Sequence, residues 1–140
     1  MQTPSWEDNG QFSPDGRWMA YVSIESGRDE VYVQPIPITR GKWQLSLGGG
    51  DLPRWRRDGK ELFFEAPDGK LMAVPVPAAG GSLTHGAPHA LFTSALPARL
   101  NSYHYEPAAD GKRFLMRVPV SGDKPSPITV VLNWQAGLKP

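Results

Sequence analysis

Short clusters of apolar, β-branched and aromatic residues, each bounded by turn residues, recur along the whole chain. This pattern predicts short β-strands joined by tight turns. Two continuous apolar runs, Val31-Tyr32-Val33 and Val130-Val131-Leu132, indicate strands that are covered on both faces. The expected strands span residues 11–13, 18–23, 30–34, 42–46, 53–56, 61–65, 70–76, 88–92, 102–106, 113–118 and 128–134.

One turn and its flanking strands repeat along the sequence. The segment FSPDGRWMAY, which begins at Phe12, aligns with WRRDGKELFF, which begins at Trp55, and more loosely with EPAADGKRFLM, which begins at Glu106. Each copy reads as a short strand, an Asp-Gly turn, a basic residue and an apolar strand. Glycine suits this turn because it accepts a positive φ without a Cβ clash, and aspartate suits it because its carboxylate bonds nearby backbone.

The spacing of this repeat predicts the architecture. The three Asp-Gly pairs lie 43 and then 52 residues apart, close to the roughly 40–50 residues of one four-stranded propeller blade. The length of 140 residues suits a single domain. We therefore expect an all-β chain that forms one partial β-propeller domain of about three four-stranded antiparallel blades, at residues 10–50, 51–97 and 98–140.

Three blades do not close a ring in which every blade is covered on both faces. The open flanks would expose apolar surface and unpaired strand edges. Two copies would supply six blades, and two-fold symmetry is the commonest symmetry of soluble assemblies. We therefore expect a homodimer of half-propellers, in which residues 1–9 supply the missing outer strand of a third blade. In the alternative, the remaining blades belong to a longer gene product.

Composition and charge exclude several function classes. Glycine and proline contribute 15 residues each, which disfavours long helices, and the absence of cysteine excludes disulfides, thiolate catalysis and Cys-ligated metal clusters. A net charge of +1 supplies no field for nucleic acid, and no apolar run approaches the roughly 18 residues that span a bilayer. We expect neither a nucleic-acid partner nor membrane insertion. The first twenty residues lack the plan of a signal peptide, so the sequence leaves localisation open.

The repeated motifs resemble a known family. QFSPDGR from Gln11 and ESGRDEVYV from Glu25 look like the WD40-like PD40 repeats of TolB-like β-propellers, and the likeness extends through PRWRRDGKELFF from Pro53 to PITVVLNW from Pro127. The whole run is similar to the C-terminal propeller end of bacterial serine/threonine protein kinases, although the kinase motifs are absent from this chain. The resemblance implies a propeller fold and a periplasmic or extracytoplasmic setting. It specifies no activity, because propellers host many unrelated functions.

The first strand of each propeller blade lies nearest the central channel, so polar side chains there are candidate ligand-binding groups. Guanidinium groups among them would match carboxylates, which favours a non-catalytic binding or assembly module for a peptide or a small anionic ligand. In the alternative interpretation these residues pack between blades, with the arginines against tryptophan faces. The candidates are Gln11, Arg54, Trp55, Arg56, Tyr103, His104 and Glu106, with Tyr105 as a further stacking surface.

The three histidines support a second hypothesis. His85, His89 and His104, with Glu106 or Asp110 nearby, would hold zinc or another divalent metal, which lowers the pKa of a bound water to about 7 and supports hydrolysis of an ester or phosphoester. Gly86 and Pro88 preclude the helix that would align the first two imidazoles. The simpler interpretation is that these histidines lie exposed on loops, and no cofactor is then required.

Overall fold

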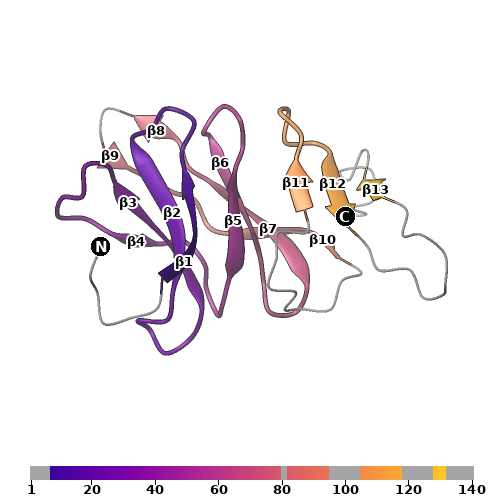
Figure 1. Ribbon diagram of the computed structural model, residues 1–140, viewed down its shortest axis with the longest axis horizontal. Coiled ribbons are helices and arrows are strands. Elements are labelled where there is room, and N and C mark those ends of the chain that lie inside the picture. The colour runs from indigo at the N-terminus through magenta and orange to yellow at the C-terminus, as the bar shows by residue number, and fades with distance from the viewer. Residues whose placement is uncertain (1–6, 80–81, 95–104, 118–127, 132–140) are drawn as a thin grey trace.

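The computed structural model describes residues 7–79, 82–94, 105–117 and 128–131, and all regular structure within these ranges is β-strand. The strands form three antiparallel sheets and a two-stranded hairpin. Figure 1 shows the three sheets side by side in chain order. This arrangement confirms the predicted all-β fold built from consecutive blade-like sheets.

The first sheet has four strands in the order β1-β2-β3-β4. They are β1 (Glu7–Phe12), β2 (Trp18–Ser23), β3 (Glu30–Pro35) and β4 (Trp43–Gln44). Strand β1 begins earlier than the predicted strand at 11–13, because Glu7 and Asp8 also pair with β2. Residues 7–9 therefore belong to the inner strand of the first sheet, and residues 1–6 lie outside the described residues.

The second sheet has the order β10-β7-β6-β5. Its strands are β5 (Asp51–Trp55), β6 (Glu61–Glu65), β7 (Lys70–Pro75) and β10 (His89–Thr93). A short hairpin of β8 (Ala78–Ala79) and β9 (Ser82–Leu83) lies between β7 and β10 in the sequence. Sequence patterning did not predict this hairpin, because two-residue strands carry no measurable alternation.

The third sheet has three described strands in the order β11-β12-β13. They are β11 (Tyr105–Pro107), β12 (Phe114–Arg117) and β13 (Ile128–Val131). Strands β12 and β13 are contained in their predicted ranges, whereas β11 extends one residue beyond its predicted end at residue 106, to Pro107. Residues 102–104 of the predicted first strand lie outside the described residues.

The hairpin between the first two strands has the same backbone bonds in all three sheets. The glycine N–H of each Asp-Gly pair donates to the carbonyl oxygen three residues earlier, at Ser13, Arg56 and Ala108, over 2.8–2.9 Å. The three glycines have φ values between 66° and 72°, in the left-handed region that glycine adopts freely. Each aspartate Oδ1 accepts from the backbone N–H two residues later, at 2.9–3.0 Å. The repeated sequence therefore encodes a repeated turn.

Two apolar cores hold the sheets together. Between the first and second sheets, Trp18 and Val33 pack in one cluster with Leu62 and Phe64. Between the second and third sheets, Phe63 and Phe114 meet edge to face with ring centroids 5.0 Å apart. Leu62 and Phe63 are both fully buried although they are adjacent, since successive strand residues point to opposite faces. The continuous apolar run in β6 therefore serves both cores.

The Gly48-Gly49-Gly50 segment connects the first sheet to the second, as expected of a linker between blades. The buried carboxylate of Glu30 holds this connection: Ser46 Oγ donates to Glu30 Oε2, and the Gly49 N–H donates to Glu30 Oε1 at 3.0 Å. A Cβ at Gly50 would lie 2.7 Å from Ser46 Cβ. Glycine is required here because the connection passes directly over packed side chains.

Candidate functional site: a pocket between the first two sheets

The inner strands of the three sheets, β1, β5 and β11, are adjacent, with β5 in contact with both others. Two of them contain a bulge at corresponding positions. The register shifts between Asp8 and Gln11 in β1 and between Asp51 and Arg54 in β5. Asn9 and Leu52, within these bulges, have φ values of 56° and 52°. Such left-handed residues turn the strand locally and expose its backbone to the neighbouring strand.

Side chains connect these inner strands through hydrogen bonds to the backbone. Trp55 Nε1 donates to the carbonyl oxygen of Gln11 at 3.1 Å, and Tyr105 Oη donates to the carbonyl oxygen of Leu52 at 2.6 Å. Each aromatic residue thus joins its own inner strand to the preceding one. Only 8% of Trp55 and 3% of Tyr105 are exposed. The structure therefore brings Gln11 and Trp55 together and uses Trp55 for packing between sheets.

The predicted arginines are engaged with carboxylates of this chain. Arg54 Nε lies 3.3 Å from Glu106 Oε2, so the structure brings these two candidates together. Arg56 instead contacts its own hairpin, with Nη1 2.9 Å from Glu61 Oε2 and Nη2 2.8 Å from Asp58 Oδ2. The hydrogen bond to Glu61 is the main cause that raises the pKa of Arg56.

The remaining predicted candidates are tested only in part. Tyr103 and His104 lie outside the described residues. His85 and His89 are exposed, and His85 Nδ1 lies 3.0 Å from the carbonyl oxygen of Gly86. Within the described ranges, no group of three or more His, Cys, Asp or Glu side chains is arranged to hold a metal. The same part of the chain has no helix of the length and hydropathy needed to cross a membrane.

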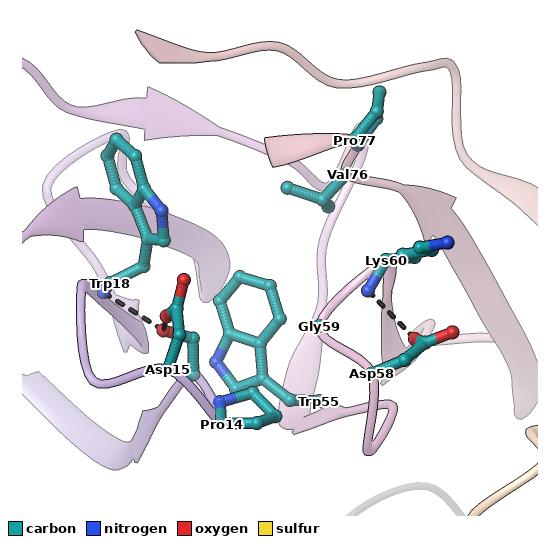
Figure 2. A pocket seen from close by; sticks show the side chains of 10 residues that line it. Pro14, Asp15, Trp18, Trp55, Asp58, Gly59, Lys60, Val76 and Pro77 are labelled. Carbon is teal, nitrogen blue, oxygen red and sulfur yellow. Dashed lines mark hydrogen bonds between the residues drawn. The ribbon is translucent and has the colours of Figure 1, made fainter. Parts of the chain in front are cut away.

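A pocket of about 650 Å³ lies between the first and second sheets, next to their Asp-Gly turns. Apolar groups dominate its walls, with two carboxylates and one ammonium among them. Figure 2 shows the Asp15 carboxylate between the indole rings of Trp18 and Trp55, with Lys60 on the opposite side of the pocket. The lining residues are Ser13, Pro14, Asp15, Trp18, Trp55, Asp58, Gly59, Lys60, Val76 and Pro77.

One of the positions at which the repeats differ lies beside the pocket. Arg56 occupies, in the second repeat, the position that Ser13 occupies in the first. Arg56 fills the corresponding place between the second and third sheets, since a Cβ at Gly111 would lie only 2.8 Å from Arg56 Cδ. Ser13 is too short to reach across in the same way, and the nearest atom to a Cβ at Gly59 is Pro14 Cδ at 3.7 Å. At this position the first junction therefore contains the pocket, whereas at the second junction Arg56 lies against the turn of the third sheet.

Hydrogen bonds fix the charge of the pocket. Asp15 Oδ1 accepts from Ser13 Oγ at 2.6 Å and from the Arg17 N–H at 3.0 Å. The bond from Ser13 is the largest cause that lowers the pKa of Asp15, so this carboxylate is ionised at neutral pH. Asp58 is engaged through Oδ1 with the Lys60 N–H and through Oδ2 with Arg56. The two carboxylates therefore differ, because only Asp15 retains an oxygen without a partner in the described part of the chain.

Sequence reasoning identified only Trp55 among the lining residues. It assigned the Asp-Gly turns a purely structural role and placed ligand chemistry on the inner strands. The available signal was the alignment itself, in which the second repeat has arginine where the first has serine. A reduction in side-chain volume at a junction between packed sheets indicates a cavity unless a neighbour fills it.

Comparisons with known proteins identify the fold. No protein-family model matches the chain, and no curated protein matches it. Solved structures do match. An oligogalacturonate lyase from Vibrio parahaemolyticus aligns with a TM-score of 0.57 at 15% identity, over 83% of this chain and 31% of the lyase. A protein assigned as TolB from Agrobacterium tumefaciens aligns with a TM-score of 0.55 at 21% identity, over 82% of this chain and 38% of that protein.

Both neighbours have the TolB-like β-propeller fold, which confirms the fold that the repeats predicted. The chain spans about a third of the length of each neighbour, so it corresponds to part of a propeller. Identities of 15% and 21% establish the fold alone. One neighbour is a lyase and the other is assigned as TolB, so the fold does not specify an activity.

Proposed function

We propose that this TolB-like β-propeller chain is a non-catalytic peptide-binding module whose ligand occupies the pocket between the first two sheets. The observation that supports it is the pocket itself, about 650 Å³ in volume, with indole walls and a carboxylate that is only partly engaged. Ligand sites are typically concave and mostly apolar, with a few placed polar groups. Its volume is within the roughly 300–1,000 Å³ of small-ligand sites.

The polar groups of the pocket favour binding over catalysis. Ser13 Oγ donates to Asp15 Oδ1 and accepts from the Trp18 N–H at 3.0 Å, so this hydroxyl is occupied in holding the turn. A carboxylate with a lowered pKa is a weak base, which makes Asp15 a poor choice to activate a hydroxyl. These groups can orient and hold a ligand without transferring a proton.

The pocket is a better candidate for the ligand site than the inner strands, because the charged group predicted there is already paired. Arg54, the guanidinium expected to bind a carboxylate ligand, already has Glu106 within 3.3 Å. An anionic ligand would have to compete with Glu106 for this guanidinium. Binding at the channel, assembly of a six-bladed homodimer and the metal-dependent hydrolase stay predictions from the sequence.

Nuclear magnetic resonance titration tests the proposed site directly. The probes are three capped peptides, acetyl-Ala-Pro-Xaa-Pro-Ala-amide, in which Xaa is arginine, citrulline or glutamate. We expect at least one peptide to shift the indole Nε1–H signals of Trp18 and Trp55 while the backbone signal of Gly111, at the filled junction, stays in place. If all three peptides leave both indole signals unchanged up to millimolar concentration, the proposed function is wrong.

A further inference from the structure

We infer that the pocket selects a peptide with an arginine or lysine side chain, which enters between Trp18 and Trp55 and pairs with Asp15. This inference rests on the proposed function and specifies the chemistry of its ligand. Three features of the pocket carry it: the orientation of one carboxylate, the aromatic walls beside that carboxylate, and the distribution of the remaining charges.

The first feature is the half-engaged carboxylate of Asp15. Ser13 Oγ and the Arg17 N–H both donate to Oδ1, and these two bonds fix the carboxylate in the turn. Oδ2 has no hydrogen-bond or ion-pair partner in the described ranges. A fixed carboxylate at a pocket wall pairs with an ammonium or guanidinium group without the ordering cost of a mobile side chain.

The second feature is the pair of tryptophans on either side of this carboxylate. Both indoles line the pocket and are otherwise held by packing, Trp18 against Trp43 at 5.7 Å between ring centroids and Trp55 through its bond to Gln11. Tryptophan has the strongest attraction for cations among the aromatic side chains. Only 5% of Trp18 and 8% of Trp55 are exposed, so an alkyl stem that ends in a cation contacts the small part of each indole that faces the pocket.

Trp18 adds a group that recognises peptide backbone. Its Nε1 faces the pocket in Figure 2. Indole N–H groups are donors, so a ligand carbonyl in the pocket could accept a hydrogen bond from it. The pocket thus offers a donor for a backbone carbonyl close to an acceptor for a cationic side chain, which together match a peptide.

The other charges of the pocket do not oppose this selection. Asp58 already pairs with Arg56 at 2.8 Å, a guanidinium that it shares with Glu61. Lys60 lines the pocket, but in Figure 2 its side chain extends away from the two indoles. On the tryptophan side, the charge of Arg17 also acts on Asp15, and Asp15 Oδ2 stays open to a ligand cation.

The test compares the arginine peptide with the citrulline peptide, which has the same shape without the charge. For the unaltered chain we expect the arginine peptide to bind about fivefold to tenfold more tightly, as measured by the dissociation constant from the Trp18 Nε1–H shift. In Asp15→Asn this ratio should fall to about twofold, the preference that the attraction of the indoles for a cation leaves. Asp110→Asn is the matched control, because it alters the same turn in the third sheet, away from the pocket.

Each contrary outcome has a defined meaning. Equal binding of the arginine and citrulline peptides by the unaltered chain overturns the inference and leaves the proposed function intact. Tighter binding of the glutamate peptide that disappears in Lys60→Gln also overturns it, since Lys60 would then be the recognising charge. If Asp15→Asn loses its folded spectrum, Trp18→Phe serves instead, followed through the Trp55 Nε1–H signal. It should weaken the arginine peptide more than the citrulline peptide, because phenylalanine attracts a cation less strongly than tryptophan does.

Discussion

Trp55 Nε1 donates a hydrogen bond to the carbonyl oxygen of Gln11, 44 residues earlier in the sequence. The bond joins the inner strands of the first two sheets, and Tyr105 makes the corresponding bond to Leu52 between the second and third. The same device therefore appears at both junctions with two different aromatic residues. In each case the bulk of the ring fills the junction while its polar atom satisfies a backbone carbonyl.

Removing either of these bonds should destabilise the chain without unfolding it. We expect Trp55→Phe and Tyr105→Phe each to lower the free energy of unfolding by about 1–3 kcal/mol, because a buried carbonyl loses its donor. The tyrosine variant is the cleaner one, since it removes only a hydroxyl. Urea unfolding followed by circular dichroism measures the change, and an unaltered midpoint for Tyr105→Phe would contradict the assigned role.

The three consecutive glycines between the first two sheets should differ sharply in tolerance. Gly49→Ala should cost more than about 3 kcal/mol, because its Cβ would overlap the ring of Pro67 and its φ is 112°. Gly48→Ala is the matched control, with a φ of 81° and no atom within 4 Å of the added Cβ. It should cost only the roughly 1–2 kcal/mol of a left-handed alanine. Equal thermal midpoints for the two variants would refute this packing.

The buried carboxylate of Glu30 should be essential to the same connection. In Glu30→Ala the Gly49 N–H and Ser46 Oγ both lose their acceptor, and we expect a loss of about 2–4 kcal/mol in unfolding free energy. Glu30→Gln retains an acceptor oxygen and should lose less. The comparison is made by chemical denaturation of both variants, and a smaller effect for alanine than for glutamine would disprove it.

Three Asp-Gly turns, the repeated ones at Asp15 and Asp110 and a further one at Asp68 between β6 and β7, should make stability depend on acid pH. The pKa of Asp15 is lowered mainly by Ser13, that of Asp68 by Lys70 and that of Asp110 by the Lys112 N–H. Each of these carboxylates has a lower pKa in the folded state than its value of about 3.8 in the unfolded state. Its contribution to the free energy of unfolding is therefore fully present above about pH 3.8. This stability is then lost as pH falls through the lowered pKa of the folded state.

We therefore expect the unaltered chain to lose part of its stability as the pH falls below about 4. A variant with Asp15→Asn, Asp68→Asn and Asp110→Asn should show a flatter profile, because the amide can still accept hydrogen bonds but does not titrate. Unfolding free energies measured across this range decide the matter. Parallel profiles for the two proteins would show that these carboxylates do not carry the dependence.

The local elements were predictable because their signals lie within a few residues. The Asp-Gly turns and the strands β2 and β6 follow from turn chemistry and apolar runs, and the predicted ranges 18–23 and 61–65 match the structure. The left-handed Leu52 was not predictable, because leucine has no local preference for that conformation and only the surrounding pairing imposes it.

The candidate site was harder to predict because it depends on which residues meet across a junction. Trp55 was identified as a ligand-stacking residue of the channel, and its position against Gln11 could be found only from the packing of two sheets. The pocket beside Ser13 likewise became visible only by comparing Ser13 with Arg56, its counterpart 43 residues later in the sequence. The period of the apolar pattern identifies which side chains are buried. It does not identify the junction between two sheets at which those side chains leave a cavity.

The substitution of serine for arginine at one repeated position has a consequence for how such arrays diversify. The Arg56 side chain lies against the turn of the following sheet, whereas the shorter Ser13 lies beside the pocket, and both turns have the same backbone bonds. The third repeat has Ala108 at this position. A further sheet packed on its outer face would again meet a short side chain there. New binding capacity can therefore emerge in a propeller through the shortening of a single side chain, with no remodelling of the scaffold.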